Sequence, residues 1–148
     1  MIRSSVAFDS NVLLSLTSAD PTKHRIAEDL LRAGGVVCVQ VVNEVVAVAR
    51  RKFRMEWAEV RELLSPIYLA CRIVPVGVET HEGGMLIAER FGFRIYDSVI
   101  LAAAIEAGCT TLLSEDMQDG QTIAGLTIRN PFAGFRAYPN PPPQTPPR

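Results

Sequence analysis

The sequence predicts an α/β fold: a three-layer α/β/α sandwich around a central, mainly parallel sheet of five strands. Two observations carry this prediction. Short apolar runs of four to six residues alternate along the chain with longer segments whose apolar residues recur at helical spacing. Strands in that order pair in parallel through helical crossovers, so helices cover both faces of the sheet.

The first strand is expected over residues 4–9, where the apolar run ends at Asp9. A short helix follows over residues 11–16. The pair Asp20 and Pro21 then marks the start of a helix over residues 22–33, because aspartate caps free N–H groups and proline is tolerated in the first turn. Two consecutive glycines end this helix.

The second strand is expected over the β-branched residues 36–39. A helix over residues 40–53 contains many valines, but its basic end suits the C-terminus of a helix dipole. The amphipathic helix over residues 56–69 contains Pro66, near which we expect it to bend or end. Trp57 is expected to pack in the core.

The third strand is expected over residues 72–76, followed by a helix over residues 79–90 that ends before a glycine. The alanine-rich segment 98–106 is the next helix. Residues 110–113 and 126–129 are the fourth and fifth strands, and their alternation with helices completes the α/β pattern.

The length of 148 residues suits one domain, which we expect over residues 1–132. A proline-rich tail is expected over residues 133–148, where six of the last ten residues are proline. The net charge of −1 gives no electrostatic sign of nucleic-acid binding. The sequence lacks a long apolar run and a secretory signal, and its three cysteines are widely spaced, so we expect a cytoplasmic protein with no membrane contact.

Four carboxylates stand near the ends of the expected elements. Asp9 closes the first strand, Glu44 lies about one turn into the following helix, Asp97 begins the alanine-rich helix and Asp116 follows the fourth strand. Ligands of open parallel sheets bind at the carboxyl ends of the strands, so these four acids can share one edge. Two such charges about 4 Å apart repel by roughly 4 kcal/mol, which calls for raised pKa values or a bound cation. Oxygen ligands favour Mg²⁺ or Mn²⁺.

Each acid also has a simpler interpretation. Asp9 and Asp97 can be helix N-caps, and Asp116 can shape a turn. Glu44 is harder to explain in this way, because it interrupts a run of valines where an uncompensated carboxylate is costly to bury. Asn11 and Ser114 are candidates for supporting the acids by hydrogen bonds, with helix capping as the alternative. Asp119 is a candidate for an additional ligand or for holding a water, with an ordinary turn at Asp119 and Gly120 as the alternative.

This ordered set of acids resembles the PIN-domain family of metal-dependent ribonucleases, and within it the VapC-type toxins of bacterial toxin–antitoxin pairs. The matching segments are residues 8–13, 43–44, 96–100 and 113–116. The resemblance covers about residues 4–130 and implies a PIN-like fold, a homodimer and a cognate antitoxin. It also implies that Asp9, Glu44, Asp97 and Asp116 surround Mg²⁺. Ser10 and Ser98 replace the threonine and alanine common in the family, and neither change removes a carboxylate.

The function implied is that of a Mg²⁺-dependent endoribonuclease, the toxin of a type II toxin–antitoxin system. Candidates for contacts with the RNA backbone, for which a solvated helix end is an equal alternative, are Arg50, Arg51, Lys52 and Arg54. A catalytically silent PIN-like scaffold for protein interaction or RNA binding is the second reading. Phosphotransfer domains fit poorly, because the chain has no lysine after Lys52 and Asn11 stands where a second aspartate is needed.

Overall fold

The computed structural model describes residues 3–133, and within them six strands form one sheet. The strands are β1 (Val6–Phe8), β2 (Gly35–Cys38), β3 (Cys71–Val74), β4 (Thr111–Leu113), β5 (Thr122–Ile123) and β6 (Leu126–Arg129). The helices are α1 (Ser10–Leu14), the 3-10 helix η1 (Ser15–Thr17), α2 (Pro21–Ala33), α3 (Val39–Arg51), α4 (Trp57–Ala70), α5 (Val78–Phe91) and α6 (Ile95–Glu106). All of the expected tail but residue 133 lies outside the described residues.

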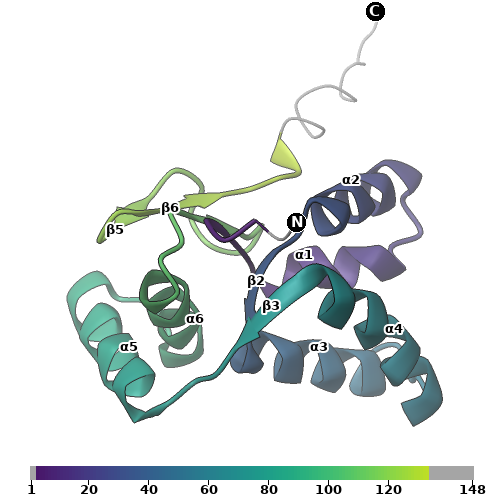
Figure 1. Cartoon of the computed structure of the whole chain (residues 1–148), viewed down its shortest axis with the longest axis horizontal. Helices are drawn as coiled ribbons and strands as arrows, with labels where there is room; N and C mark the ends of the chain where they lie inside the picture. Colours follow the sequence, from purple (N-terminus) through teal and green to yellow (C-terminus); the bar gives the residue numbers. More distant parts are fainter. Residues whose placement is uncertain (1–2, 134–148) are drawn as a thin grey trace, which may run out of the picture.

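The sheet has the strand order β3-β2-β1-β4-β6-β5, and every pairing except the last is parallel. Connections from β1 to β2 and on to β3 move in one direction, whereas the connection from β3 to β4 returns past β1. Because parallel crossovers are right-handed, this reversal places α1–α4 on one face and the pair α5 and α6 on the other (Figure 1). The expected three-layer α/β/α arrangement with a mainly parallel sheet is confirmed.

The expected number of five strands is wrong, because β5 adds a sixth at one edge. It pairs antiparallel with β6, with Thr122 opposite Thr127. The two residues between the strands, Ala124 and Gly125, both have positive φ, at 49° and 83°. Two consecutive residues with positive φ are typical of the tight turn that joins the strands of a hairpin with a two-residue loop. A strand of two residues is too short to show alternation, and alanine is an unusual first residue for such a turn, so the sequence carries no clear signal for it.

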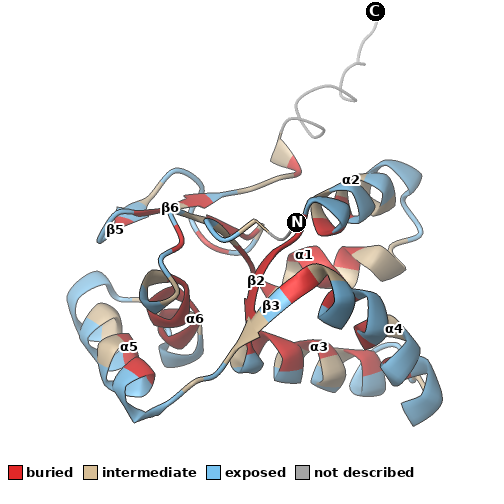
Figure 2. Cartoon of the chain, viewed as in Figure 1, coloured by how far each residue is buried: buried red, intermediate tan, exposed pale blue. Residues whose placement is uncertain are grey.

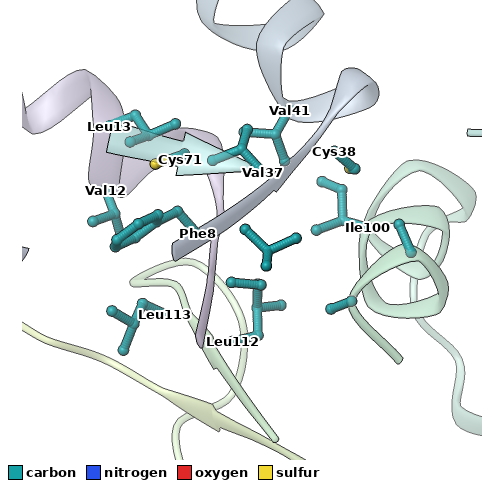
Figure 3. Close-up of a cluster of buried hydrophobic side chains, with 14 of the residues drawn as sticks. Phe8, Val12, Leu13, Val37, Cys38, Val41, Cys71, Ile100, Leu112 and Leu113 are labelled. Atoms are coloured by element: carbon teal, nitrogen blue, oxygen red, sulfur yellow. The ribbon is translucent and has the colours of Figure 1, made fainter. Parts of the chain in front are cut away.

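The hydrophobic core lies on both faces of the sheet. Successive residues of a strand point to opposite faces, so Phe8 and Leu113 point towards α1, and Leu112 points towards α6 (Figure 3). All of β2 is buried. The helix α6 is buried along most of its length because α5 covers its outer side, and α5 itself is largely exposed (Figure 2).

The expectation that Trp57 packs in the core is wrong: the residue is 54% exposed at the first position of α4, and the Arg50 guanidinium lies 4.5 Å from its ring centroid. Of the two outcomes expected at Pro66, a bend or an end, the helix does not end there but continues to Ala70 as one element. Packing of its buried side, which includes Ile67, offsets the backbone hydrogen bond that proline cannot donate. Within residues 3–133, no helix is at once long and apolar enough to cross a lipid bilayer.

Candidate active site

A cleft of about 530 Å³ at the carboxyl ends of the central strands is lined by all four acids expected from the sequence. They arrive from four elements: Asp9 follows β1, Glu44 lies in α3, Asp97 lies in the first turn of α6, and Asp116 follows β4. The strands β1 and β4 are neighbours at the point where the chain reverses its direction across the sheet. This switch point is where open parallel sheets leave a crevice for a ligand.

Asp9 is the most buried of the four, with 3% of its surface exposed. It is the N-cap of α1, and its Oδ1 accepts a hydrogen bond of 2.7 Å from the backbone N–H of Ser10. Its Oδ2 accepts one of 2.7 Å from the Ser114 hydroxyl and one of 3.2 Å from the Asn11 amide. The capping interpretation is therefore correct for Asp9, and it also faces the cleft.

Burial raises the pKa of Asp9 from 3.8 to about 6. The hydrogen bonds from Ser114 and Ser10 lower the pKa, but they offset only part of the desolvation. The negative charges of Glu44 and Asp97 raise it further. The fold thus holds a carboxylate in a site that disfavours its charge.

Asn11 and Ser114 join the start of α1 to the loop after β4. The Ser114 hydroxyl oxygen accepts hydrogen bonds from the backbone N–H of Asp116, at 3.2 Å, and of Met117, at 3.4 Å. The Asn11 carbonyl oxygen accepts one of 3.0 Å from the backbone N–H of Glu115. Both residues therefore support Asp9 and also fix the loop that carries Asp116.

Glu44 is half-buried, and both its oxygens are hydrogen-bonded. Oε1 accepts from the Ser10 hydroxyl, and Oε2 accepts from the Gln40 amide, each at 2.9 Å. These two partners were not among the residues singled out from the sequence. Gln40 stands four residues before Glu44 on the same helix, a spacing that brings side chains together. Ser10 adjoins Asp9, and from the sequence it is notable only as a departure from the family pattern.

Asp97 is paired with Arg94, whose Nε lies 3.6 Å from Oδ2. Burial raises the pKa of Asp97, the charges of Glu44 and Asp116 add to the rise, and Arg94 opposes it. Asp97 is the third residue of α6 and does not cap it, since Arg94 occupies the N-cap position. The simpler N-cap interpretation is therefore wrong for Asp97.

The remaining candidates separate into two groups. Arg51 lines the cleft, whereas Arg50, Lys52 and Arg54 do not. Asp119 also lies outside the cleft lining, and its Oδ1 accepts a hydrogen bond of 2.9 Å from the backbone N–H of Asn130. That contact ties the turn before β5 to the end of β6.

The chemistry of the four acids fits a hard divalent cation. All four place carboxylate oxygens, the atoms that such a cation prefers, in one cleft, where burial and the neighbouring acids raise the pKa values of Asp9 and Asp97. As they stand, no three acidic, histidine or cysteine side chains within residues 3–133 are grouped closely enough to coordinate one ion together. Glu44 is instead held by Ser10 and Gln40, and Asp97 by Arg94. A cation would compete with these side chains for the same oxygens.

The raised pKa of Asp9 predicts a pH-dependent gain in stability for Asp9→Asn without divalent cations. The folded protein holds the Asp9 proton more tightly than the unfolded chain does, so stability from this group is complete below pH 3.8 and is lost as the pH rises through about 6. A shift of about 2 units corresponds to about 3 kcal/mol. The unfolding free energy of the variant, minus that of the wild type, should therefore grow by most of this amount between pH 4 and pH 8. Urea denaturation in EDTA measures this, and a difference that is constant with pH would contradict it.

The family model described as PIN domain matches residues 6–118. The fold is similar to that of Mycobacterium tuberculosis VapC20, a sarcin–ricin loop cleaving toxin, with a TM-score of 0.59 and 15% identity over 76% of this chain and 90% of that chain. It is similar to a chain of a toxin–antitoxin complex from Klebsiella pneumoniae, with a TM-score of 0.65 and 24% identity over 86% and 98%.

A third similar fold is a chain of VapBC2 from Rickettsia felis bound to a fragment of promoter DNA, with a TM-score of 0.62 and 17% identity over 88% and 98% of the two chains. At these identities the likeness shows a shared fold. No curated protein matches the chain at a significant level.

Proposed function

Because the chain belongs to the PIN domain family, whose model matches residues 6–118, we propose that it is a metal-dependent endoribonuclease and the toxin of a type II toxin–antitoxin pair. The observation that carries this proposal is the meeting of four acids from four separate elements in one cleft. The named toxin and the toxin–antitoxin complexes with similar folds support it further.

In the proposed mechanism, Asp9, Glu44, Asp97 and Asp116 would hold Mg²⁺ or Mn²⁺. A divalent cation bound there supplies Lewis acidity to a phosphate oxygen and lowers the pKa of a bound water. Asp9 is oriented for this role by its hydrogen bonds with Ser114 and Asn11. The scissile phosphate of RNA would lie over the acids, where its own negative charge needs compensation.

Two guanidinium groups border the acids and suit contacts with the RNA backbone. Arg51 lines the cleft from the last position of α3, and Arg94 lines it beside Asp97. Planar guanidinium groups pair with phosphate oxygens through two hydrogen bonds, which positions a strand without reading its sequence. Their presence explains how a chain with a net charge of −1 can hold a polyanion.

We propose a cognate antitoxin as the protein partner, because solved complexes with similar folds contain a toxin and an antitoxin. The family resemblance also implies a homodimer. Exposed apolar side chains on α5, Val78 and Leu86, are 78% and 66% exposed and suit contact with a second protein surface.

The second candidate is a catalytically silent scaffold with the same fold. The observation that favours it is the set of hydrogen bonds that already holds Glu44, with the ion pair that holds Asp97. In a scaffold the acids would serve only to make these hydrogen bonds and this ion pair. Such a protein would bind no divalent cation at a saturable site, whereas the nuclease would.

Removal of metal gives the direct test of the proposed activity. The purified protein, free of its partner, should cut single-stranded RNA in Mg²⁺ and lose this activity in excess EDTA, because the phosphate then meets only uncompensated carboxylates. Added Mg²⁺ or Mn²⁺ should restore cleavage, followed by gel electrophoresis of end-labelled RNA. Cleavage that continues at the same rate in EDTA would contradict the mechanism.

A further inference from the structure

We propose that a groove beside the acidic cleft binds unpaired bases of single-stranded RNA, with Phe53 as the surface on which a base stacks. The inference rests on the proposed function and adds to it a groove and a specific residue that hold the substrate. Its basis is the combination of an exposed aromatic ring, unpaired cations and direct continuity with the acids.

The groove has a volume of about 890 Å³ and runs between the start of α1 and the end of α3. It shares four lining residues with the acidic cleft: Ser10, Val48, Arg51 and Asp116. The two hollows are therefore continuous, and a strand whose phosphate lies at the acids can extend into the groove. Phe53 and Lys52 line the groove but not the cleft.

The positive charge of the groove comes mainly from two residues that have no acidic partner among the residues that the structure describes. Arg51 and Lys52 are exposed, and neither forms an ion pair with any of residues 3–133. The third cation of the groove, Lys23, is already paired with Glu115 at 2.8 Å. Unpaired cations next to an exposed aromatic ring are the combination with which proteins hold single strands.

Phe53 is 44% exposed and stands on an ordered turn. Its backbone N–H donates to the Val48 carbonyl at 3.3 Å, and the N–H of Met55 donates to the Ala49 carbonyl at 3.0 Å. The Lys52 ammonium lies 6.0 Å from the ring centroid, at the outer limit of a cation–π contact. These hydrogen bonds fix the backbone at Phe53, and the Lys52 ammonium beside the ring is available to a phosphate of the stacked nucleotide.

The neighbouring Arg50 has a different role. Its guanidinium donates to the Met55 carbonyl at 2.8 Å and lies over the Trp57 ring. It therefore stabilises the connection between α3 and α4, and we exclude it from the RNA contacts. Bases in a duplex are stacked on each other and cannot reach a protein ring, so the groove selects single-stranded segments.

The test uses the Asp97→Asn background, in which bound RNA should stay intact, and fluorescence anisotropy of labelled single-stranded oligoribonucleotides. Phe53→Ala should raise the dissociation constant roughly tenfold, since one base–aromatic stack is lost. Phe53→Tyr should restore binding, because it keeps the ring face. The matched control is Phe91→Ala: Phe91 is 41% exposed, has the Arg90 guanidinium 5.4 Å from its ring and lies in a different hollow. It should leave binding unchanged.

An RNA in which one nucleotide at a time lacks its base identifies the stacked position. At that position, loss of the base should weaken binding to the Phe53 protein roughly tenfold and leave binding to Phe53→Ala unchanged. The inference would be overturned if Phe53→Ala and Phe91→Ala changed the dissociation constant equally. It would also be overturned if no abasic position weakened binding to the Phe53 protein more than it weakened binding to Phe53→Ala. In that case wild-type cleavage in Mg²⁺ would still support the proposed nuclease. RNA binding without any cleavage would instead reject the nuclease and retain the groove.

Discussion

Asp97→Asn is expected to lower the rate of RNA cleavage about 1,000-fold. Asp97 borders the cleft together with Asp9 and Glu44. The charge of Asp97 raises the pKa of Asp9, and the charge of Glu44 raises the pKa of both aspartates. Replacing one carboxylate by a neutral amide weakens cation binding and so reduces the stabilisation of the transition state. A loss of about 4 kcal/mol lowers the rate 1,000-fold. Single-turnover cleavage of labelled RNA in Mg²⁺ measures the loss.

The control for this variant is Asp29→Asn. Asp29 is an exposed aspartate with an arginine three residues away, Arg32, at 3.0 Å, just as Asp97 has Arg94 at 3.6 Å. The two substitutions therefore remove the same charge and the same kind of ion pair, but only one is in the cleft. Asp29→Asn should cleave at the wild-type rate. An Asp97→Asn protein that keeps its fold and cleaves within tenfold of wild type would exclude Asp97 from the reaction.

Gly35→Ala is expected to lower the free energy of unfolding by about 3 kcal/mol. Gly35 begins β2 beside β1, and an added Cβ would lie 2.6 Å from the Phe8 ring and 2.8 Å from the Val6 carbonyl oxygen. The backbone oxygen cannot rotate away, so β1 and β2 would have to separate. Because Asp9 follows β1, the same displacement would disturb the site. Urea denaturation monitored by circular dichroism gives the value.

Gly83→Ala is the matched control. Its Cβ would lie 3.6 Å from that of Ala102, an ordinary contact, and the position is inside α5. Alanine favours a helix over glycine by about 1 kcal/mol, so this variant should be more stable than the wild type. A loss of stability of the same size in both variants would contradict the steric explanation for Gly35.

Much of this fold could be predicted from the sequence because its signals are local. The apolar run before Asp9 and the cap at Asp20 mark elements that the structure contains. The strand β5 and the exposure of Trp57 could not be predicted, because neither leaves a distinct pattern in the sequence. A strand of two residues is too short to show alternating burial. An aromatic residue at the start of a helix gives the same sequence pattern whether its ring is buried or lies over a neighbouring arginine.

The site was only partly predictable for a related reason. The four acids could be chosen from their positions at element ends, because parallel strands bring those ends together. The partners of these acids depend on side-chain geometry across distant segments, and so Ser10 beside Glu44 was missed. For the same reason Arg50 and Arg51 cannot be told apart from the sequence alone, although one lies over Trp57 and the other lines the cleft.

Calorimetric titration of the intact protein with Mn²⁺ tests most directly whether these acids together form a cation site. We expect saturable binding to the wild type and to Asp29→Asn, and its loss in Asp97→Asn, with protons released on binding near pH 6 as Asp9 gives up its proton. Equal Mn²⁺ binding by Asp97→Asn and wild type, or no saturable binding by either, would contradict the shared metal site.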